Sequence, residues 1–372
     1  ACDDTPASHP PTVDISLEET AAIFSSLPID LQHLREVHDA VSASSGNGYD
    51  EEYTLRDLIS CPGAGVGDDP VQTRADAYDR PLRDLLRSYL ENRPATRASA
   101  LPADSYLHAL EDSDAQIFWP FHENWDGRSY PVITWQPEGD ATTNTGWELV
   151  PSEYGGIDVQ EVIVSEEMAM QRPVWVLNRN DDSSYKTLEV LRREDPDWGT
   201  GGSLVLKSGA APDASEGRTL YLKDFTMNRN YDNWFAGASE FFIKVGSVEG
   251  FTASTEAEML LYQPTVTDFM MVVRRSEKGT KRKADIVLVG DWTDQLESFA
   301  LMITEDDGGT RTTWKSSATV KVQSKSYGYD ISIPFNSRDD IVWRGQLSSR
   351  YFARNNSVSG NFGDVSLTFQ IR

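Results

Sequence analysis

The spacing of the apolar residues changes near residue 116, and this change constrains the fold more than any other feature. Before it, apolar residues such as Leu17, Ala21 and Phe24 recur three or four positions apart, which is the period of an amphipathic helix. After it, short runs such as Tyr130–Gln136 alternate with turn residues, which indicates β-strands. We therefore expect an α+β protein with a small helical N-terminal region followed by mostly antiparallel β regions.

Four regions follow from this pattern. Residues 1–13 contain three prolines and no periodic pattern, so they are predicted to be a tether. Residues 14–112 are predicted to form a helical region and residues 116–217 a β-rich domain. Residues 218–372 carry enough strand candidates for a C-terminal β-sandwich domain built from two sheets.

The charge is distributed unevenly. The formal net charge is −25, yet residues 218–372 carry 19 basic and 19 acidic residues, so the whole excess lies before residue 218. An acidic surface repels phosphate backbones, which argues against a nucleic-acid partner. No apolar run approaches the roughly 20 residues that a membrane-spanning helix needs.

The first residues suggest an exported protein. The sequence begins Ala1-Cys2-Asp3-Asp4 and continues into a proline-rich run. This start resembles the maturation site of bacterial lipoproteins, and the acidic residues are similar to those of surface lipoproteins from Bacteroidales-type bacteria. The resemblance implies lipidation of Cys2, an outer-membrane or cell-surface location, and membrane attachment through the lipid anchor only. The alternative is a chain boundary that happens to precede a cysteine.

A loop inside Tyr221–Val245 is the first candidate for an ion site. Two predicted strands flank a segment rich in Asn and Asp, including Asp232. Such side chains supply the oxygen ligands that calcium prefers. Asn and Asp are also ordinary turn residues, so a surface turn is the alternative.

Part of the C-terminal region resembles the C2-type β-sandwich. The runs that carry the resemblance are Gly237–Val245 and Phe299–Asp307, the second followed by two glycines. The sequence departs from the family pattern at Glu240 and Phe241, where the family has aspartate and proline. The resemblance implies that Asp232, Asp306 and Asp307 bind calcium, the one cofactor we expect.

Tryptophans are dense in the predicted β-rich domain, and three of them, Trp119, Trp125 and Trp135, are candidates for ligand binding. An exposed indole stacks well on a sugar ring, whereas a buried indole serves the core. Both roles remain open at this point.

The loop from His122 to Gly127 places an imidazole next to the carboxylates of Glu123 and Asp126. This combination suits metal binding or acid–base chemistry. The second histidine of an HExxH motif is absent, so a hydrogen-bonded loop histidine is the simpler interpretation.

These observations favour a non-enzymatic binding protein with a glycan or a surface protein as its ligand. The sequence lacks a nucleophile elbow, a metal-ligand spacing and a nucleotide fingerprint. One alternative is a secreted glycoside hydrolase or other polysaccharide-processing enzyme, because its two carboxylates have no local signature. Glu123 with Asp126, or Asp291 with Asp294, are candidates for that pair. The other alternative is a structural or adhesion component of the cell surface.

Overall fold

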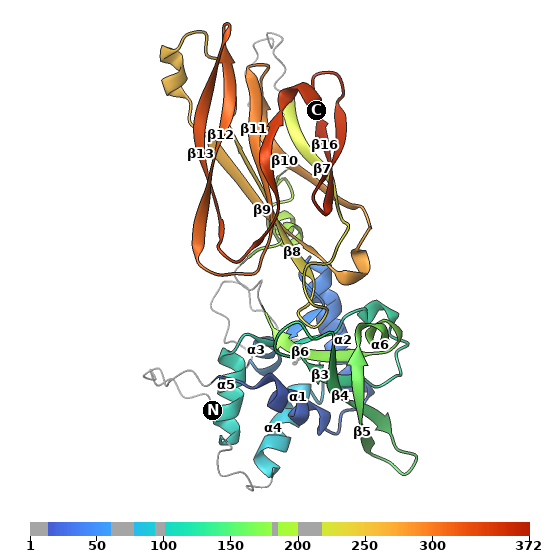
Figure 1. Ribbon diagram of the computed structural model, residues 1–372. Helices are drawn as coiled ribbons and strands as arrows, with labels where there is room; N and C mark the ends of the chain where they lie inside the picture. Colours follow the sequence, from blue (N-terminus) through green and yellow to red (C-terminus); the bar gives the residue numbers. More distant parts are fainter. Residues whose placement is uncertain (1–13, 61–77, 94–100, 181–184, 200–217) are drawn as a thin grey trace. The chain divides into compact units, whose positions relative to one another are not determined.

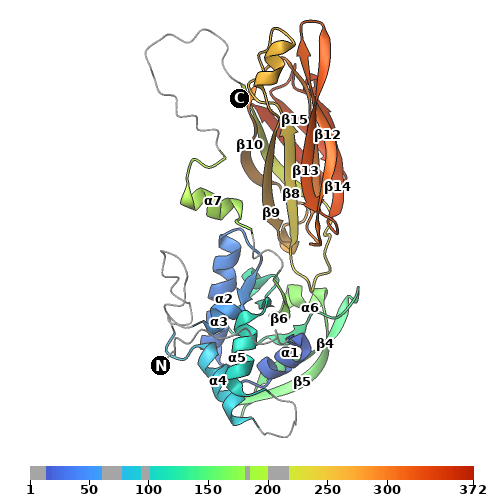
Figure 2. The same cartoon turned by 90° about the vertical axis from the view of Figure 1, so that its left-hand side faces the viewer.

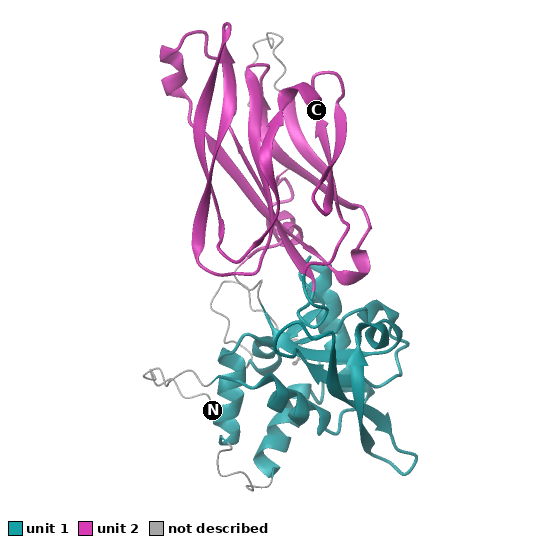
Figure 3. Cartoon of the chain, in the orientation of Figure 1, with its two compact units in different colours: residues 1–183, 232–237 teal, residues 184–231, 238–372 magenta. Residues whose placement is uncertain are grey.

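The computed structural model describes residues 14–60, 78–93, 101–180, 185–199 and 218–372. The chain divides into two compact units: unit 1 contains residues 1–183 and 232–237, and unit 2 contains residues 184–231 and 238–372 (Figure 3). The predicted tether and Cys2 lie outside the described residues, so both stay predictions. Within the described ranges, no helix has the length and apolar character required to cross a bilayer.

Unit 1 is built on one six-stranded sheet with the order β1-β2-β6-β3-β4-β5 (Figure 1). All neighbouring strands in it are antiparallel except β3 and β6, which run parallel. The strands are β1 (Glu52–Thr54), β2 (Ala115–Phe118), β3 (Val132–Trp135), β4 (Thr143–Pro151), β5 (Ile157–Ser165) and β6 (Val174–Arg179).

Helices of unit 1 pack on this sheet and on one another, with α1 against β3 and β6, and α3 and α4 against α5 (Figure 2). The expected helical region and the strands that follow it therefore share one unit and one core. The helices are α1 (Leu17–Ser25), α2 (Leu31–Gly46), α3 (Leu55–Ile59), α4 (Leu82–Asn92), α5 (Ala103–Asp112) and α6 (Glu166–Gln171).

Strand β6 is buried on both faces. Trp175 and Leu177 belong to the core that contains α1 and α2, whereas Val174 and Val176 belong to a second core. Side chains alternate between the two faces of a strand, so each core lies on its own side of the sheet. Because both sides of β6 are covered, its sequence is a continuous apolar run rather than an alternating one.

Glu36 on α2 connects this helix to the start of α4 and to β1 through hydrogen bonds. Helix α4 follows Pro81 and has no side-chain cap of its own. The carboxylate of Glu36 supplies one, because its Oε2 accepts from the backbone N–H of Leu82 at 2.7 Å, while its Oε1 accepts from the Tyr53 hydroxyl at 3.0 Å. A negative group at a helix N-terminus is stabilising. Burial nevertheless raises the pKa of Glu36. The position of α2 fixes that of His38, which belongs to the site described below.

The segment 232–237, which connects two strands of unit 2, completes the second core of unit 1. Trp234 and Phe235 are buried there, and the Trp234 indole N–H donates to the carbonyl of Thr142 at 2.9 Å. The fully buried Asn178 amide donates to the carbonyls of Phe235 at 3.0 Å and Ala236 at 2.8 Å. These contacts hold the segment against the sheet.

Unit 2 is a sandwich of two antiparallel sheets, which confirms the predicted α+β class with a C-terminal β-sandwich (Figure 1). One sheet has the order β10-β7-β16-β15, and the other has the order β13-β12-β11-β8-β9 with β14 also paired to β11. A short helix, α7 (Leu188–Glu194), precedes them. The strands are β7 (Arg218–Met227), β8 (Ser239–Ser247), β9 (Thr265–Val273), β10 (Arg282–Trp292), β11 (Leu296–Glu305), β12 (Arg311–Val322), β13 (Lys325–Asn336), β14 (Asp340–Ser348), β15 (Ser357–Phe362) and β16 (Val365–Ile371).

Strand β8 is buried along its whole length. Phe241 and Ile243 face the large core between the sheets. Gly246 lies under Ile331 of β13 so closely that a Cβ atom would come within 2.6 Å of the Ile331 side chain. The β12–β13 hairpin therefore covers the outer face of β8, and this cover is what buries Lys244.

We predict that Asn178→Ala destabilises unit 1. The change removes two buried hydrogen bonds and leaves two carbonyls without this donor, which costs about 1–3 kcal/mol. Hydrogen exchange should show weaker protection of residues 233–237, and the denaturant midpoint should fall. Asn92→Ala is the control, because that amide donates to Ser88 on an exposed helix surface and its loss should change stability by less than about 0.5 kcal/mol. Equal midpoints for the two variants would contradict the prediction.

Candidate functional site

Unit 1 contains a hollow of about 70 Å³ beside the end of β2. Its wall combines aromatic side chains with amide, carboxylate and guanidinium groups. The loop after β2 supplies most of the wall, and α6 and the two residues between α6 and β6 supply the rest. The lining residues are Trp119, Phe121, Asn124, Trp125, Asp126, Ser129, Ala169, Gln171, Arg172 and Pro173.

The loop that builds the hollow is held in an unusual backbone conformation. Phe121 has φ 57° and ψ 30°, the left-handed region, directly before the short 3-10 helix His122–Asn124. For a bulky residue this conformation costs roughly 1–2 kcal/mol. Such strain tends to persist at functional sites, where the surroundings hold it in place.

Asp126 fastens the far end of the same loop. Its carboxylate accepts from the backbone N–H groups of Arg128 at 2.8 Å and Ser129 at 2.7 Å, and from the Ser129 hydroxyl at 2.7 Å. The hydrogen bonds from Ser129 and Arg128 lower the pKa of Asp126 to about 2. Asp126 is therefore an ionised turn anchor, whereas a glycosidase acid needs a raised pKa.

Two of the three candidate tryptophans meet at the hollow. The rings of Trp119 and Trp125 pack edge to face with centroids 5.4 Å apart, and His38 lies 5.5 Å and 5.1 Å from them. Trp119 is 1% exposed, so it serves the core, while Trp125 is half-buried. Trp135 stacks on Trp147 at 5.4 Å and does not line this hollow.

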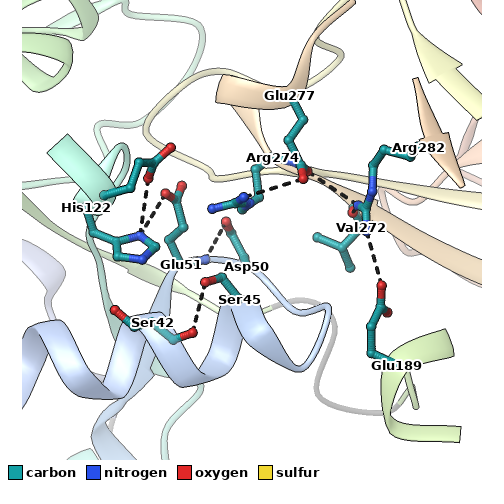
Figure 4. A network of polar contacts seen from close by, with 11 residues as sticks. Ser42, Ser45, Asp50, Glu51, His122, Glu189, Val272, Arg274, Glu277 and Arg282 are labelled. Atoms are coloured by element: carbon teal, nitrogen blue, oxygen red, sulfur yellow. Dashed lines mark hydrogen bonds and ion pairs between the residues drawn. The ribbon is translucent and has the colours of Figure 1, made fainter. Parts of the chain in front are cut away.

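Next to the hollow, two carboxylates lie close to the imidazole nitrogen of His122, and all three groups can ligate a metal. The His122 Nδ1 atom lies 3.0 Å from Glu51 Oε1 and 3.6 Å from Glu123 Oε2. Figure 4 shows the Glu51 carboxylate turned toward the His122 imidazole. The sequence draws attention to His122 and Glu123 but not to Glu51, which is 71 residues away. In the sequence, Glu51 is marked only by the acidic run Asp50-Glu51-Glu52 at the start of a strand, which does not by itself indicate a metal ligand.

In unit 2, the calcium candidates Asp306 and Asp307 lie beside Asp339. Asp306 Oδ1 accepts from the Gly308 N–H at 3.0 Å and from the Asn336 amide at 3.1 Å. Burial and then the charges of Asp340 and Asp306 raise the pKa of Asp307. Asp232 is counted with unit 1, so these candidates do not converge within one unit.

A second hollow, also of about 70 Å³, lies in unit 2 between the outer face of β8 and the β12–β13 hairpin, and Asp339 is part of its wall. Lys244 is 5% exposed there, with its ammonium 3.2 Å from Asp268 and 4.7 Å from the centre of the Phe242 ring. Burial raises the pKa of Asp268 despite this partner. An internal ion pair of this kind satisfies its own charges and is weak evidence for stability.

The comparisons with known proteins assign no family. No protein-family model matches the sequence, and no curated protein matches it. A Drosophila structure described as C2-DSL-EGF1 is 11% identical, with 42% of this chain and 66% of that chain covered, at a TM-score of 0.17. The chain thus spans just under two thirds of that structure's chain. The C2-type resemblance stays a prediction.

We predict that Asp339→Asn stabilises unit 2 at neutral pH. Burial, reinforced by Asp306, raises the pKa of Asp339 from 3.8 to about 6. A raised acid pKa means that the folded state binds the proton more tightly, so stability is lost as pH rises from about 4 to 6. At pH 7.5 the variant should be more stable than the wild type by roughly 1–3 kcal/mol in unfolding free energy and should melt at a higher temperature, whereas at pH 3 the two should be equally stable.

Asp330→Asn, on an exposed position of β13, is the control for this measurement. It should change the melting temperature little at either pH. A wild-type stability that does not fall between pH 4 and pH 7, or an Asp339→Asn variant that melts lower at pH 7.5, would contradict the assignment.

Proposed function

We propose that the protein is a non-enzymatic binding protein whose unit 1 holds a saccharide at the hollow lined by Trp119 and Trp125. The observation that carries this proposal is the position of the half-buried Trp125 indole among the side chains of Asn124, Gln171 and Arg172. A sugar ring offers an apolar C–H face to an indole and hydroxyl groups to amides and charged groups. The hollow supplies both kinds of partner.

The hollow is too small to enclose a whole sugar, so we expect it to bind only part of a saccharide. A cavity of about 150 Å³ accommodates a benzene molecule, whereas this one has about 70 Å³. It therefore admits the edge of one ring, and the rest of a saccharide chain extends into solvent. A glycan end or branch is the class of ligand that suits such a site.

The hydrolase alternative has weaker support. A glycosidase requires one carboxyl group with a raised pKa beside a second carboxylate. Asp126 has the opposite pKa shift. In the other candidate pair, Asp294 is 91% exposed and pairs with Arg218. All four candidate carboxyl groups are exposed, whereas a glycosidase acid has a raised pKa that burial provides.

The proposal predicts that Trp125→Ala weakens saccharide binding at least tenfold, equal to about 1.4 kcal/mol, because the indole is the accessible aromatic surface. Isothermal titration of the full chain with a panel of neutral and acidic oligosaccharides measures this loss. Asn124→Ala, an exposed position in the same wall, should also weaken binding and leaves the core intact.

Trp135→Ala is the matched control. Trp135 and Trp125 are both half-buried and pack against the same core, but only Trp125 lines the hollow. Trp135→Ala should bind as the wild type does. If the wild type binds no saccharide in the panel, or if Trp125→Ala and Trp135→Ala bind equally, the proposal fails. The adhesion alternative would then take its place.

We propose in addition that Asp306 and Asp307, with Asp339, bind calcium in unit 2. Supporting this is the position of three carboxylates side by side: burial, and then neighbouring carboxylates, raise the pKa values of Asp307 and Asp339. A divalent cation would relieve the charge repulsion. Calcium requires six to eight oxygen ligands, so water must complete the shell.

Calcium at one hundred times its dissociation constant should stabilise the folded protein by about 2.7 kcal/mol, measured as a melting shift against excess chelator at pH 7.5. Asp307→Asn should abolish the shift. Asp330→Asn, at an exposed position of β13, should leave it unchanged. No shift in the wild type at millimolar calcium would rule the site out.

A further inference from the structure

The Glu51, His122 and Glu123 side chains bring three potential metal ligands close together. Both carboxylates approach the same atom, His122 Nδ1, at 3.0 Å and 3.6 Å. A metal ion placed among the three atoms would serve all of them at once.

We propose that Glu51, His122 and Glu123 bind a divalent transition metal, with zinc as the best match. Zinc lies about 2.0–2.2 Å from histidine nitrogen and carboxylate oxygen, so neighbouring ligand atoms of a tetrahedral site are about 3.3–3.5 Å apart. The two measured distances fall on either side of that value. All three ligand atoms lie within 4.8 Å of one another.

The surroundings hold two of these ligands in place. The backbone N–H of Trp119 donates to the carbonyl of Glu51 at 2.9 Å, which fixes Glu51 beside the end of β2. His122 follows the left-handed Phe121 and is 6% exposed. Glu123 has a side chain that is 42% exposed, so the cluster is open to solvent at this ligand. One exposed ligand beside two buried ones provides an entry path.

Three protein ligands leave the fourth position of a tetrahedral zinc ion open to water or a ligand atom. The imidazole of His38 is the next group available, because its ring centroid lies 5.4 Å from that of His122. Imidazole with carboxylate suits zinc, whereas calcium prefers oxygen ligands alone. The site should therefore prefer zinc to calcium.

The test uses the full chain with Cys2→Ser and Cys61→Ser, so that no thiol can bind the metal. The metal-free protein is titrated with zinc ions alone by calorimetry, in competition with a chelator of known affinity. We expect one zinc ion per chain, no comparable binding of calcium at this site, and an increase in melting temperature. Glu123→Gln and His122→Ala should each weaken zinc binding at least tenfold.

Glu123→Gln keeps the assay informative if His122→Ala or Glu51→Gln fails to fold, because Glu123 is exposed. His108→Ala is the matched control, since it removes a surface histidine 3.8 Å from Glu111 on α5 and should leave zinc affinity unchanged. Absence of zinc binding at micromolar concentration, or equal affinities for Glu123→Gln and the parent protein, would overturn the proposal. No saccharide is present, so this outcome is independent of the saccharide proposal.

Discussion

Burial of β6 on both faces is the constraint on which unit 1 depends. One face is covered by the helices, but the other is completed by residues 232–237, which lie more than fifty positions further along the chain. The Asn178 amide, fully buried at the end of this strand, holds that segment through two carbonyls. Two hydrogen bonds from one buried NH2 group specify one arrangement of the backbone, because any other arrangement leaves that group unpaired.

Strand β6 and its neighbour β2 determine the position of the loop that carries the candidate site. The chain leaves β2 at Phe118, turns through the left-handed Phe121, and is fastened again at Asp126. This short path brings Trp125 to the hollow and His122 to Glu51. The aromatic wall and the proposed metal site thus depend on one loop, although their chemistry is separate and each has its own test.

In unit 2, a covered face of a sheet contains the charged side chains of Lys244 and Asp268. The β12–β13 hairpin packs over β8 and buries Lys244, which is accommodated because Asp268 lies directly across the β8–β9 pair. Asp339, at the edge of the same hollow, has a carboxylate neighbour in place of a cation, and burial, reinforced by Asp306, raises its pKa. Burial raises the pKa of Asp268 as well, despite its ammonium partner, and the ionised Asp339 weakens the folded state above about pH 6.

The sequence by itself determined the class of the fold, because the change from helical to strand spacing near residue 116 is a local property of the chain. It also identified Trp119, Trp125, His122 and Glu123 as candidates. Only the tertiary structure separated Trp135 from the other tryptophans and brought in Glu51. It also decided that the helices and the first sheet share one unit, and that residues 232–237 belong to it. These are contacts between distant residues, and periodicity and spacing carry no information about such pairs.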